Sequence, residues 1–312
     1  MSHNTATTGI PPGKRRLSGK RNRESLVAYS FIAPNFIGFA VFTLVPLIFA
    51  FVLAFLNWDG ANPMSFAGLD NFGQLIRNTQ FHKALLNTII YTAGVMPLTI
   101  VCALALSILL NQKITGRNFF RTVSFFPYVA SLVAVTAVWN FLFSPTRGPV
   151  NNLLNAITGI PFEQLPGWGA SKDWALFTAI FFTVWKNMGY YMVIYLAGLQ
   201  GINAELYEAS ELDGANGWQR FRNVTVPQLA PTTFFVTIIL VINSFKVYDI
   251  FINLFAGGDN QLSDATRVLV YQIYNTAFRS LNFGYASAQA MVLFLLVLCV
   301  TLIQFRGEKK FG

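Results

Sequence analysis

Six long apolar stretches restrict this chain more than any other feature of its sequence. They cover residues 30–56, 85–110, 123–142, 174–199, 232–255 and 286–305, and four of them contain no Asp, Glu, Lys or Arg. An α-helix of about 20 apolar residues crosses about 30 Å of hydrocarbon. The stretches lack the short alternating pattern of outer-membrane barrel strands. The sequence therefore predicts an all-α integral membrane protein with six transmembrane helices.

The overall composition agrees with this prediction. Only 11% of the residues are charged and 54% are apolar, whereas a soluble domain carries about 25% charged residues. These figures argue against a soluble enzyme, a disordered chain and a fibrous repeat. Cys102 and Cys299 lie inside apolar stretches, so we expect reduced cysteines. His3 and His82 are far apart, and no metal site is expected.

Basic residues are distributed unequally between the connecting segments. The N-terminal tail, residues 111–122 and 200–231 and the C-terminal tail hold 14 Lys and Arg, against 6 in residues 57–84, 143–173 and 256–285. Cytoplasmic loops carry the excess of Lys and Arg, so both termini are predicted to be cytoplasmic. The expected organisation is a basic tail at 1–29, a six-span domain at 30–305 and a second tail at 306–312. The first apolar stretch is too long for the core of a signal peptide.

The most informative polar segment is 203–227, on the side predicted to be cytoplasmic. Asn203 is a favourable helix N-cap, and Gly214 suits the left-handed residue that ends a helix. A second short helix is expected to begin near Asn216. The segment should form a helix–turn–helix at the membrane surface, with an unusual concentration of small and acidic residues.

This segment resembles the EAA motif of the permease subunits of binding-protein-dependent ABC importers, which reads Glu-Ala-Ala-x-x-x-Gly with a downstream Pro. Glu208, Ala209 and Gly214 match at the required spacing, and Ser210 replaces the second Ala. The surrounding sequence is most similar to the carbohydrate-uptake branch of that family. Residues 31–34, 126–127 and 248–249 are similar to the same branch, so the resemblance covers nearly all of the chain beyond about residue 29.

The resemblance implies a type I ABC importer permease fold in a prokaryotic plasma (inner) membrane. It also implies three kinds of partner: a second, similar permease, two cytoplasmic ATPase subunits and an extracytoplasmic solute-binding protein. ATP and Mg would be bound by the ATPase, and the chain itself lacks a G-x-x-x-x-G-K-[ST] phosphate loop. No cofactor, metal or nucleic acid is expected to bind this chain. The first short helix would dock on the ATPase through Glu208, Ala209, Ser210, Asp213, Gly214 and Ala215.

Polar residues also occur inside the fourth and fifth apolar stretches, where a central charge costs at least about 2.5–3.5 kcal/mol. Asn243, Lys246 and Asp249 follow at i, i+3 and i+6, which predicts one stripe of a helix. Asp249 is expected to neutralise either Lys246 or Lys186. Two interpretations remain open: a path for the transported solute, or polar groups that hold helices together. The candidates for the path are Trp185, Lys186, Asn187, Tyr190, Asn243, Lys246, Tyr248 and Asp249.

The segments 143–173 and 256–285 are long enough to carry structure of their own. Residues 268–278 are expected to form a short amphipathic helix, and the resemblance implies that both segments receive the solute-binding protein. We therefore expect a non-enzymatic permease subunit of an ATP-driven importer for a sugar or oligosaccharide. A glycerol phosphate-type solute is an alternative, because Lys186 and Lys246 suit an anion. An ion-coupled secondary transporter would not explain the 203–227 segment, and a membrane-embedded enzyme would lack a catalytic cluster.

Overall fold

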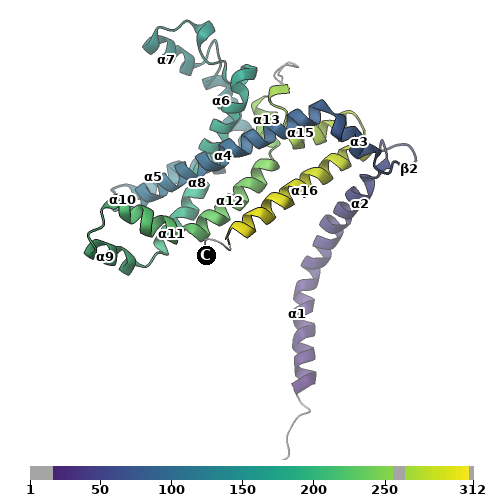
Figure 1. Ribbon diagram of the computed structural model, residues 1–312, viewed down its shortest axis with the longest axis horizontal. Coiled ribbons are helices and arrows are strands. Elements are labelled where there is room, and N and C mark those ends of the chain that lie inside the picture. The colour runs from purple at the N-terminus through teal and green to yellow at the C-terminus, as the bar shows by residue number, and fades with distance from the viewer. Residues whose placement is uncertain (1–16, 256–263, 309–312) are drawn as a thin grey trace, which may run out of the picture. The chain divides into compact units, whose positions relative to one another are not determined.

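The structure, a computed structural model, describes residues 17–255 and 264–308 of the 312-residue chain. Apart from one short hairpin, the elements of this part of the chain are helices (Figure 1). The chain divides into two compact units, Met1–Val52 and Leu53–Gly312. The first 16 residues of the predicted N-terminal tail and the last four of the C-terminal tail lie outside the described residues.

The first unit is a single helical rod. α1 (Leu17–Phe39) continues through the π-helical turn η1 (Ala40–Leu44) into α2 (Val45–Leu53). Pro46 is the second residue of α2, and the wider π turn before it accommodates a residue that has no N–H and whose ring crowds the preceding turn. Val27–Leu53 is long and apolar enough to span a membrane. This agrees with the first predicted span, although the helix ends before residue 56.

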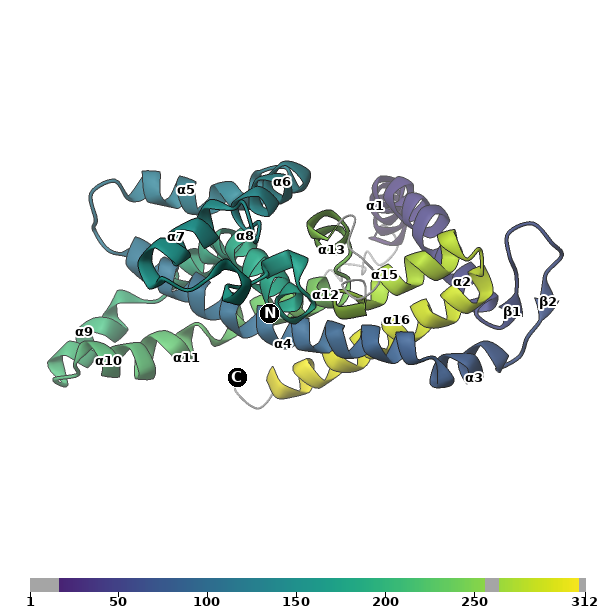
Figure 2. The same ribbon diagram turned by 90° about the horizontal axis from the view of Figure 1, so that it is seen from above.

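The second unit is built around α4 and α8, which pack against each other along much of their length (Figures 1 and 2). The large side chains Tyr91, Phe182, Met192, Tyr195 and Val236 are fully buried in its core. Its elements in chain order are β1 (Leu56–Asn57), β2 (Ser65–Phe66), α3 (Asp70–Arg77), α4 (Thr79–Asn111), α5 (Arg117–Val129), α6 (Leu132–Leu142), α7 (Pro149–Thr158), η2 (Phe162–Gln164), η3 (Trp168–Ala170), α8 (Lys172–Gln200), α9 (Ala204–Leu212), α10 (Gly217–Arg220), η4 (Phe221–Thr225), α11 (Val226–Gln228), α12 (Ala230–Phe245), α13 (Asp249–Leu254), α15 (Leu269–Tyr274), η5 (Asn275–Arg279) and α16 (Phe283–Glu308).

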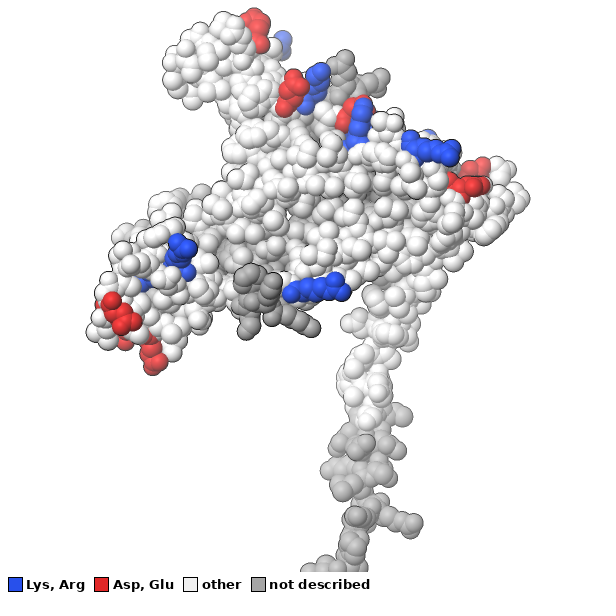
Figure 3. Space-filling view, viewed as in Figure 1, with Lys and Arg blue, Asp and Glu red and all other residues white. Residues whose placement is uncertain are grey.

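Among the described residues, three helices are long and apolar enough to cross a membrane: Val27–Leu53, Thr79–Asn111 and Phe283–Gly307. Two bent pairs raise the number to five if each pair is one span. The fourth predicted stretch lies within α8, which is 29 residues long but more polar than these helices. On the visible face of the second unit, charged side chains gather along its upper margin and over α9 and α10, with an uncharged band between (Figure 3). The count of six spans stays a prediction.

The third apolar stretch is not one helix. α5 ends at Val129, Ala130 and Ser131 have extended backbones, and α6 begins at Leu132 with a change of direction of 98°. Pro127 lies in the last turn of α5. A proline introduces strain into a helix and removes one backbone hydrogen bond, which favours a break close to this position.

The fifth apolar stretch is also divided, so the prediction of one continuous stripe through Asn243, Lys246 and Asp249 is wrong. α12 ends at Phe245 with Lys246 as its C-cap, and α13 begins at Asp249. A basic residue stabilises the C-terminal end of a helix dipole and an acidic residue stabilises the N-terminal end. The two charges that a continuous helix would have to bury therefore mark the ends of two separate helices.

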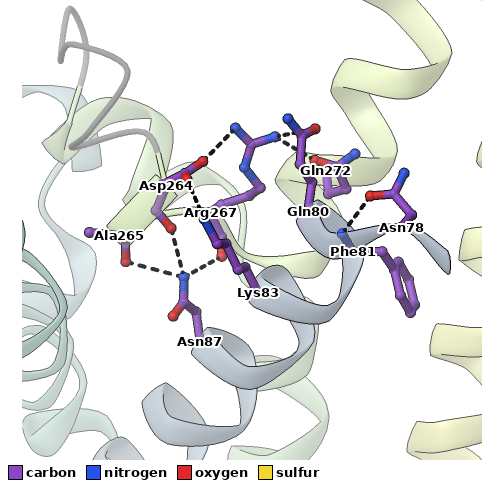
Figure 4. A network of polar contacts seen from close by, with 9 residues as sticks. All are labelled: Asn78, Gln80, Phe81, Lys83, Asn87, Asp264, Ala265, Arg267 and Gln272. Carbon is purple, nitrogen blue, oxygen red and sulfur yellow. Dashed lines mark hydrogen bonds and ion pairs between the residues drawn. The ribbon is translucent and has the colours of Figure 1, made fainter. Parts of the chain in front are cut away.

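A polar network fastens the segment before α15 to the start of α4 (Figure 4). The Asn87 side chain donates to the carbonyls of Asp264, Ala265 and Arg267 at 3.1, 3.2 and 3.0 Å. Lys83 Nζ lies 2.6 Å from Asp264 Oδ2 and, by donating this hydrogen bond, lowers the pKa of the Asp264 carboxyl. The helix predicted at 268–278 is confirmed as α15 and η5, and this network fixes where it begins.

Candidate functional site

The 203–227 segment has the caps that its sequence predicts. The Asn203 side chain accepts a hydrogen bond from the Glu205 N–H at 3.0 Å, which defines the start of α9. Gly214 has a φ of +75°, the left-handed conformation expected of a helix-ending glycine. Asn216 caps α10 and exchanges hydrogen bonds with Gln219 in a capping box. Both short helices therefore have defined ends.

Two side-chain contacts join α9 to the helical segment Gly217–Gln228, which precedes α12. The Tyr207 and Thr225 hydroxyls are 3.0 Å apart, and Thr225 is the last residue of the π-helical turn η4. Glu211 of α9 forms an ion pair with Arg220 at the end of α10. These contacts fix α9 against α10 and η4.

Most of the candidate coupling residues form an exposed surface at one end of the second unit, where α9 and α10 lie (Figures 1 and 2). Glu208, Ala209, Asp213 and Gly214 are exposed, and Ser210 and Ala215 are half-buried. Two large apolar side chains stand beside them: Leu212 is 90% exposed and Trp218 is 68% exposed. A Cβ atom at Gly214 would meet nothing within 4 Å, so this glycine is required by its backbone conformation and not by crowding.

A second feature is a cavity of about 330 Å³ between α4, α8, the α5–α6 bend and the junction of α12 with α13. Seven of the eight candidate path residues line it: Lys186, Asn187, Tyr190, Asn243, Lys246, Tyr248 and Asp249. The eighth, Trp185, lies outside the lining, and its ring packs 5.0 Å from that of Trp139. Although the fifth stretch is divided into two helices, its polar residues still lie together, because the linker of residues 246–248 lines the cavity.

Lys186 is held by backbone carbonyls at the bend of the third stretch. Its Nζ donates to Pro127 O at 2.8 Å, Ala130 O at 3.1 Å and Tyr128 O at 3.4 Å, and the residue is only 9% exposed. An ammonium group has three donors, and all three are used. In the part of the chain that the structure describes, ion pairs join Lys83 and Arg267 to Asp264 and Arg220 to Glu211. The predicted neutralisation of Asp249 by Lys186 or Lys246 is therefore wrong.

Aromatic and hydroxyl groups complete the cavity. Tyr128 stacks on Tyr190 with ring centroids 4.5 Å apart and an interplanar angle of 15°. The lining also contains Thr183, Tyr191 and Ser244, which the sequence did not single out. Tyr128 reaches the cavity from the bent third stretch, so its role depends on a bend that apolar periodicity does not reveal. The site offers amides, hydroxyls and ring faces, groups that bind by hydrogen bonding and stacking.

Comparisons with known proteins agree with this architecture. The chain is 36% identical over 282 residues to the lactose transport system permease protein LacF of Rhizobium radiobacter, which covers 90% of this chain and 93% of the relative. It is 32% identical over 280 residues to the probable starch degradation products transport system permease protein AmyD of Thermoanaerobacterium thermosulfurigenes (90% and 93%). It is 30% identical over 286 residues to the sn-glycerol-3-phosphate transport system permease protein UgpA of Agrobacterium fabrum (91% and 95%).

The fold is similar to that of solved transporters. A chain of a bacterial ABC transporter involved in the import of the acidic polysaccharide alginate matches with a TM-score of 0.82 and 23% identity, covering 94% of this chain and 98% of that chain. The same kind of transporter in complex with an alginate pentasaccharide-bound periplasmic protein matches with a TM-score of 0.80 and 24% identity, over 93% and 96%. The family model of binding-protein-dependent transport system inner membrane components matches residues 96–311, and the chain belongs to that family.

Proposed function

We propose that this chain forms one half of the membrane pathway of an ATP-driven importer for a sugar or oligosaccharide. A solute-binding protein outside the cell would deliver the cargo, and alternating access would be coupled to separate ATPase subunits that bind ATP and Mg. The relatives of the chain are transporter permease subunits, and ATP hydrolysis would take place in the partner ATPase. A second, similar permease would complete the pathway.

The observation that carries this proposal is the exposed, well-capped segment at α9 and α10. Glu208 and Ala209 lie on its open surface, next to the apolar side chains of Leu212 and Trp218. An exposed Trp with acidic neighbours suits a protein partner, since aromatic residues are enriched in interfaces. The contacts of Tyr207 and Glu211 with the helical segment Gly217–Gln228, which directly precedes α12, would let a displacement of α9 be passed on to the membrane helix.

The cavity supports a sugar cargo. Asn187 and Asn243 offer amides, and the Tyr128–Tyr190 stack offers ring faces, which together suit hydroxyl groups and the apolar face of a sugar ring. All three donors of Lys186 are used by backbone carbonyls, and the lining holds the acidic Asp249 together with Lys246. This arrangement favours an uncharged cargo over a glycerol phosphate. The relatives named for lactose and for starch degradation products agree with a sugar cargo, and the relative named for sn-glycerol-3-phosphate agrees with the alternative.

Two substitutions test the ATPase docking. Glu208→Lys reverses an exposed charge without touching a buried contact, and Gly214→Pro imposes a negative φ where the backbone needs +75°. Both variants should insert in the membrane, fail to co-purify the ATPase and lose uptake. The matched control is Glu163→Lys, which reverses another exposed carboxylate, in η2. Normal co-purification of the ATPase with both coupling variants would refute the docking assignment.

Orientation and energy source need separate measurements. Single cysteines at positions 208 and 163 should react with a membrane-impermeant thiol reagent from opposite sides, with position 208 cytoplasmic as the basic loops predict. Vanadate should block uptake in an ATP-driven importer and leave an ion-coupled transporter unaffected. Uptake that follows an imposed ion gradient without ATP would replace the proposal by that alternative.

A further inference from the structure

A row of aromatic side chains leaves the cavity and ends in a second pocket. It consists of Tyr248, Tyr274, Phe278, Phe283 and Trp58, and is called the aromatic row below. Successive ring centroids are 5.1, 5.1, 5.9 and 5.4 Å apart. Tyr248 lines the cavity and Trp58 lines the second pocket, so each end opens into a hollow.

The row is exposed along its middle. Phe278 is 61% exposed and Tyr274 is 37% exposed, on the helical turns of α15 and η5. Tyr271, one turn before Tyr274, stacks near Tyr248 at 6.4 Å and widens this end of the row. The rings of Tyr274 and Phe278 are therefore available to a ligand as well as to each other.

The far end of the row is held rigidly. The carbonyl of Trp58 accepts hydrogen bonds from the N–H groups of Phe283 and Gly284 at 3.0 and 3.3 Å. A Cβ atom at Gly284 would lie 2.0 Å from the Leu56 carbonyl oxygen, so only glycine permits this approach of hairpin and helix. Trp58 and Phe283 keep a fixed separation for this reason.

The second pocket has the chemistry of a sugar subsite. It encloses about 390 Å³ and is lined by Trp58 together with polar residues that include Asn57, Asp59, Asn62 and Asn282. Backbone hydrogen bonds from Asn62 and Ala61, with the Asn62 side chain, lower the pKa of Asp59 to about 2. The carboxylate therefore stays ionised, and it offers an acceptor to hydroxyl groups beside an indole ring.

We propose that the aromatic row is a binding track for an extended oligosaccharide, leading from the pocket at Trp58 to the cavity at Tyr248. Sugar rings stack their apolar faces on aromatic side chains, and the exposed rings of Tyr274 and Phe278 offer such faces between the two polar hollows. Several weak, similar subsites let a ligand enter and still leave. The inference rests on the proposed function and narrows its cargo to chains of several sugar units.

A membrane-interface belt of aromatic residues and an interface with the second permease are the other candidate uses of this surface. A belt would need no polar hollow at either end, whereas both ends of this row have one. A permease interface would exclude water from Phe278. Both alternatives make Phe278 inaccessible to a water-soluble reagent, which the experiment below measures.

The test uses the complete importer with its ATPase, second permease and binding protein. Uptake is measured for α- and β-linked gluco- and galacto-oligosaccharides of two to six units, with Phe278→Ala, the ring-preserving Phe278→Tyr, and Phe141→Ala as the control. Phe141 is 66% exposed on α6 and lies outside the row. Loss of one stacking contact should raise KM for the five- and six-unit sugars about 3- to 10-fold. The disaccharide KM should change less than about 2-fold by the same reasoning, and Phe278→Tyr should restore the parent values.

Three results would overturn the track: equal effects of Phe278→Ala on short and long sugars, the same effect from Phe141→Ala, or no uptake of any sugar longer than two units. A cysteine at position 278, in a background with Cys102 and Cys299 replaced by Ala, should also react with an impermeant thiol reagent. Failure to react would assign the surface to lipid or to the second permease. ATPase co-purification, read in the same preparations, separates failure of the track from failure of the importer assignment.

Discussion

Gly189 is the position at which a single added methyl group should do most damage. It lies on α8 where this helix crosses α5, and a Cβ atom there would be 1.9 Å from the Ser124 carbonyl oxygen, 2.6 Å from its carbonyl carbon and 2.9 Å from Phe125 Cα. All three obstacles are backbone atoms, which cannot rotate away. In Gly189→Ala, α5 would have to withdraw from α8 by about 1.1 Å to restore a tolerated separation of 3.0 Å.

The same displacement would strain a neighbouring contact. Lys186 lies on the preceding turn of α8 and bonds carbonyls at the end of α5, including Pro127 O at 2.8 Å. Overpacking costs about 1–3 kcal/mol, and we place Gly189→Ala at the upper end, about 3 kcal/mol, because weakened charge-assisted bonds add to it. The helix propensity gained from alanine, about 1 kcal/mol, does not offset this loss.

The assay is the apparent unfolding temperature of the purified protein in detergent, with two other Gly→Ala variants as controls. At Gly94 the nearest atom is the flexible Ile180 Cδ1 at 2.7 Å, so a small loss is expected. At Gly73 nothing lies within 4 Å, so stability should be unchanged or slightly higher. Gly189→Ala should lower the temperature by roughly 5 °C or more. Equal values for Gly189→Ala and Gly73→Ala would refute the close crossing of α5 and α8.

Two further predictions concern contacts outside the cavity. Tyr207→Phe removes the hydroxyl that bonds Thr225 and keeps the ring. The ATPase should still co-purify with this variant, but less cargo should be moved per ATP hydrolysed. An unchanged ratio of transport to ATP hydrolysis would contradict the role of this contact in coupling. The Asp264 carboxyl has a lowered pKa in the folded protein because Lys83 donates a hydrogen bond to it. The stabilisation from this carboxylate is therefore complete above its unfolded pKa of about 3.9, and it is lost as the pH falls through its folded pKa. The destabilisation caused by Asp264→Asn, measured as a shift in unfolding temperature, should therefore be constant from about pH 7 to 5 and shrink toward pH 3; a loss that grows on acidification would contradict the ion pair.

The features that sequence predicted well depend on local physics. The N-cap at Asn203, the left-handed Gly214 and the start of α10 after Asn216 each depend on one residue and its immediate backbone. The short helix near 268–278 follows in the same way from its pattern. Such elements need no knowledge of the rest of the chain.

The features that sequence missed depend on contacts between distant segments. The bend after Val129 exposes carbonyls that Lys186 binds from another helix, 59 residues away at Pro127. An apolar stretch reads as one span whether or not it is bent, because hydropathy does not record direction. The pairing expected for Asp249 failed for the same reason: opposite charges near each other in sequence were assigned to one helix, and the chain instead ends a helix between them.

Because α12 and α13 are separate helices, two walls of the cavity lie on elements that can move independently. Asn243 and Ser244 lie on α12. The segment before α12 contains η4, where Thr225 contacts Tyr207 of α9. Asp249 and Ile250 lie on α13, beyond the linker. A displacement of α12 therefore need not carry α13 with it. In the proposed importer, the two walls of the cavity would move relative to each other within a single chain.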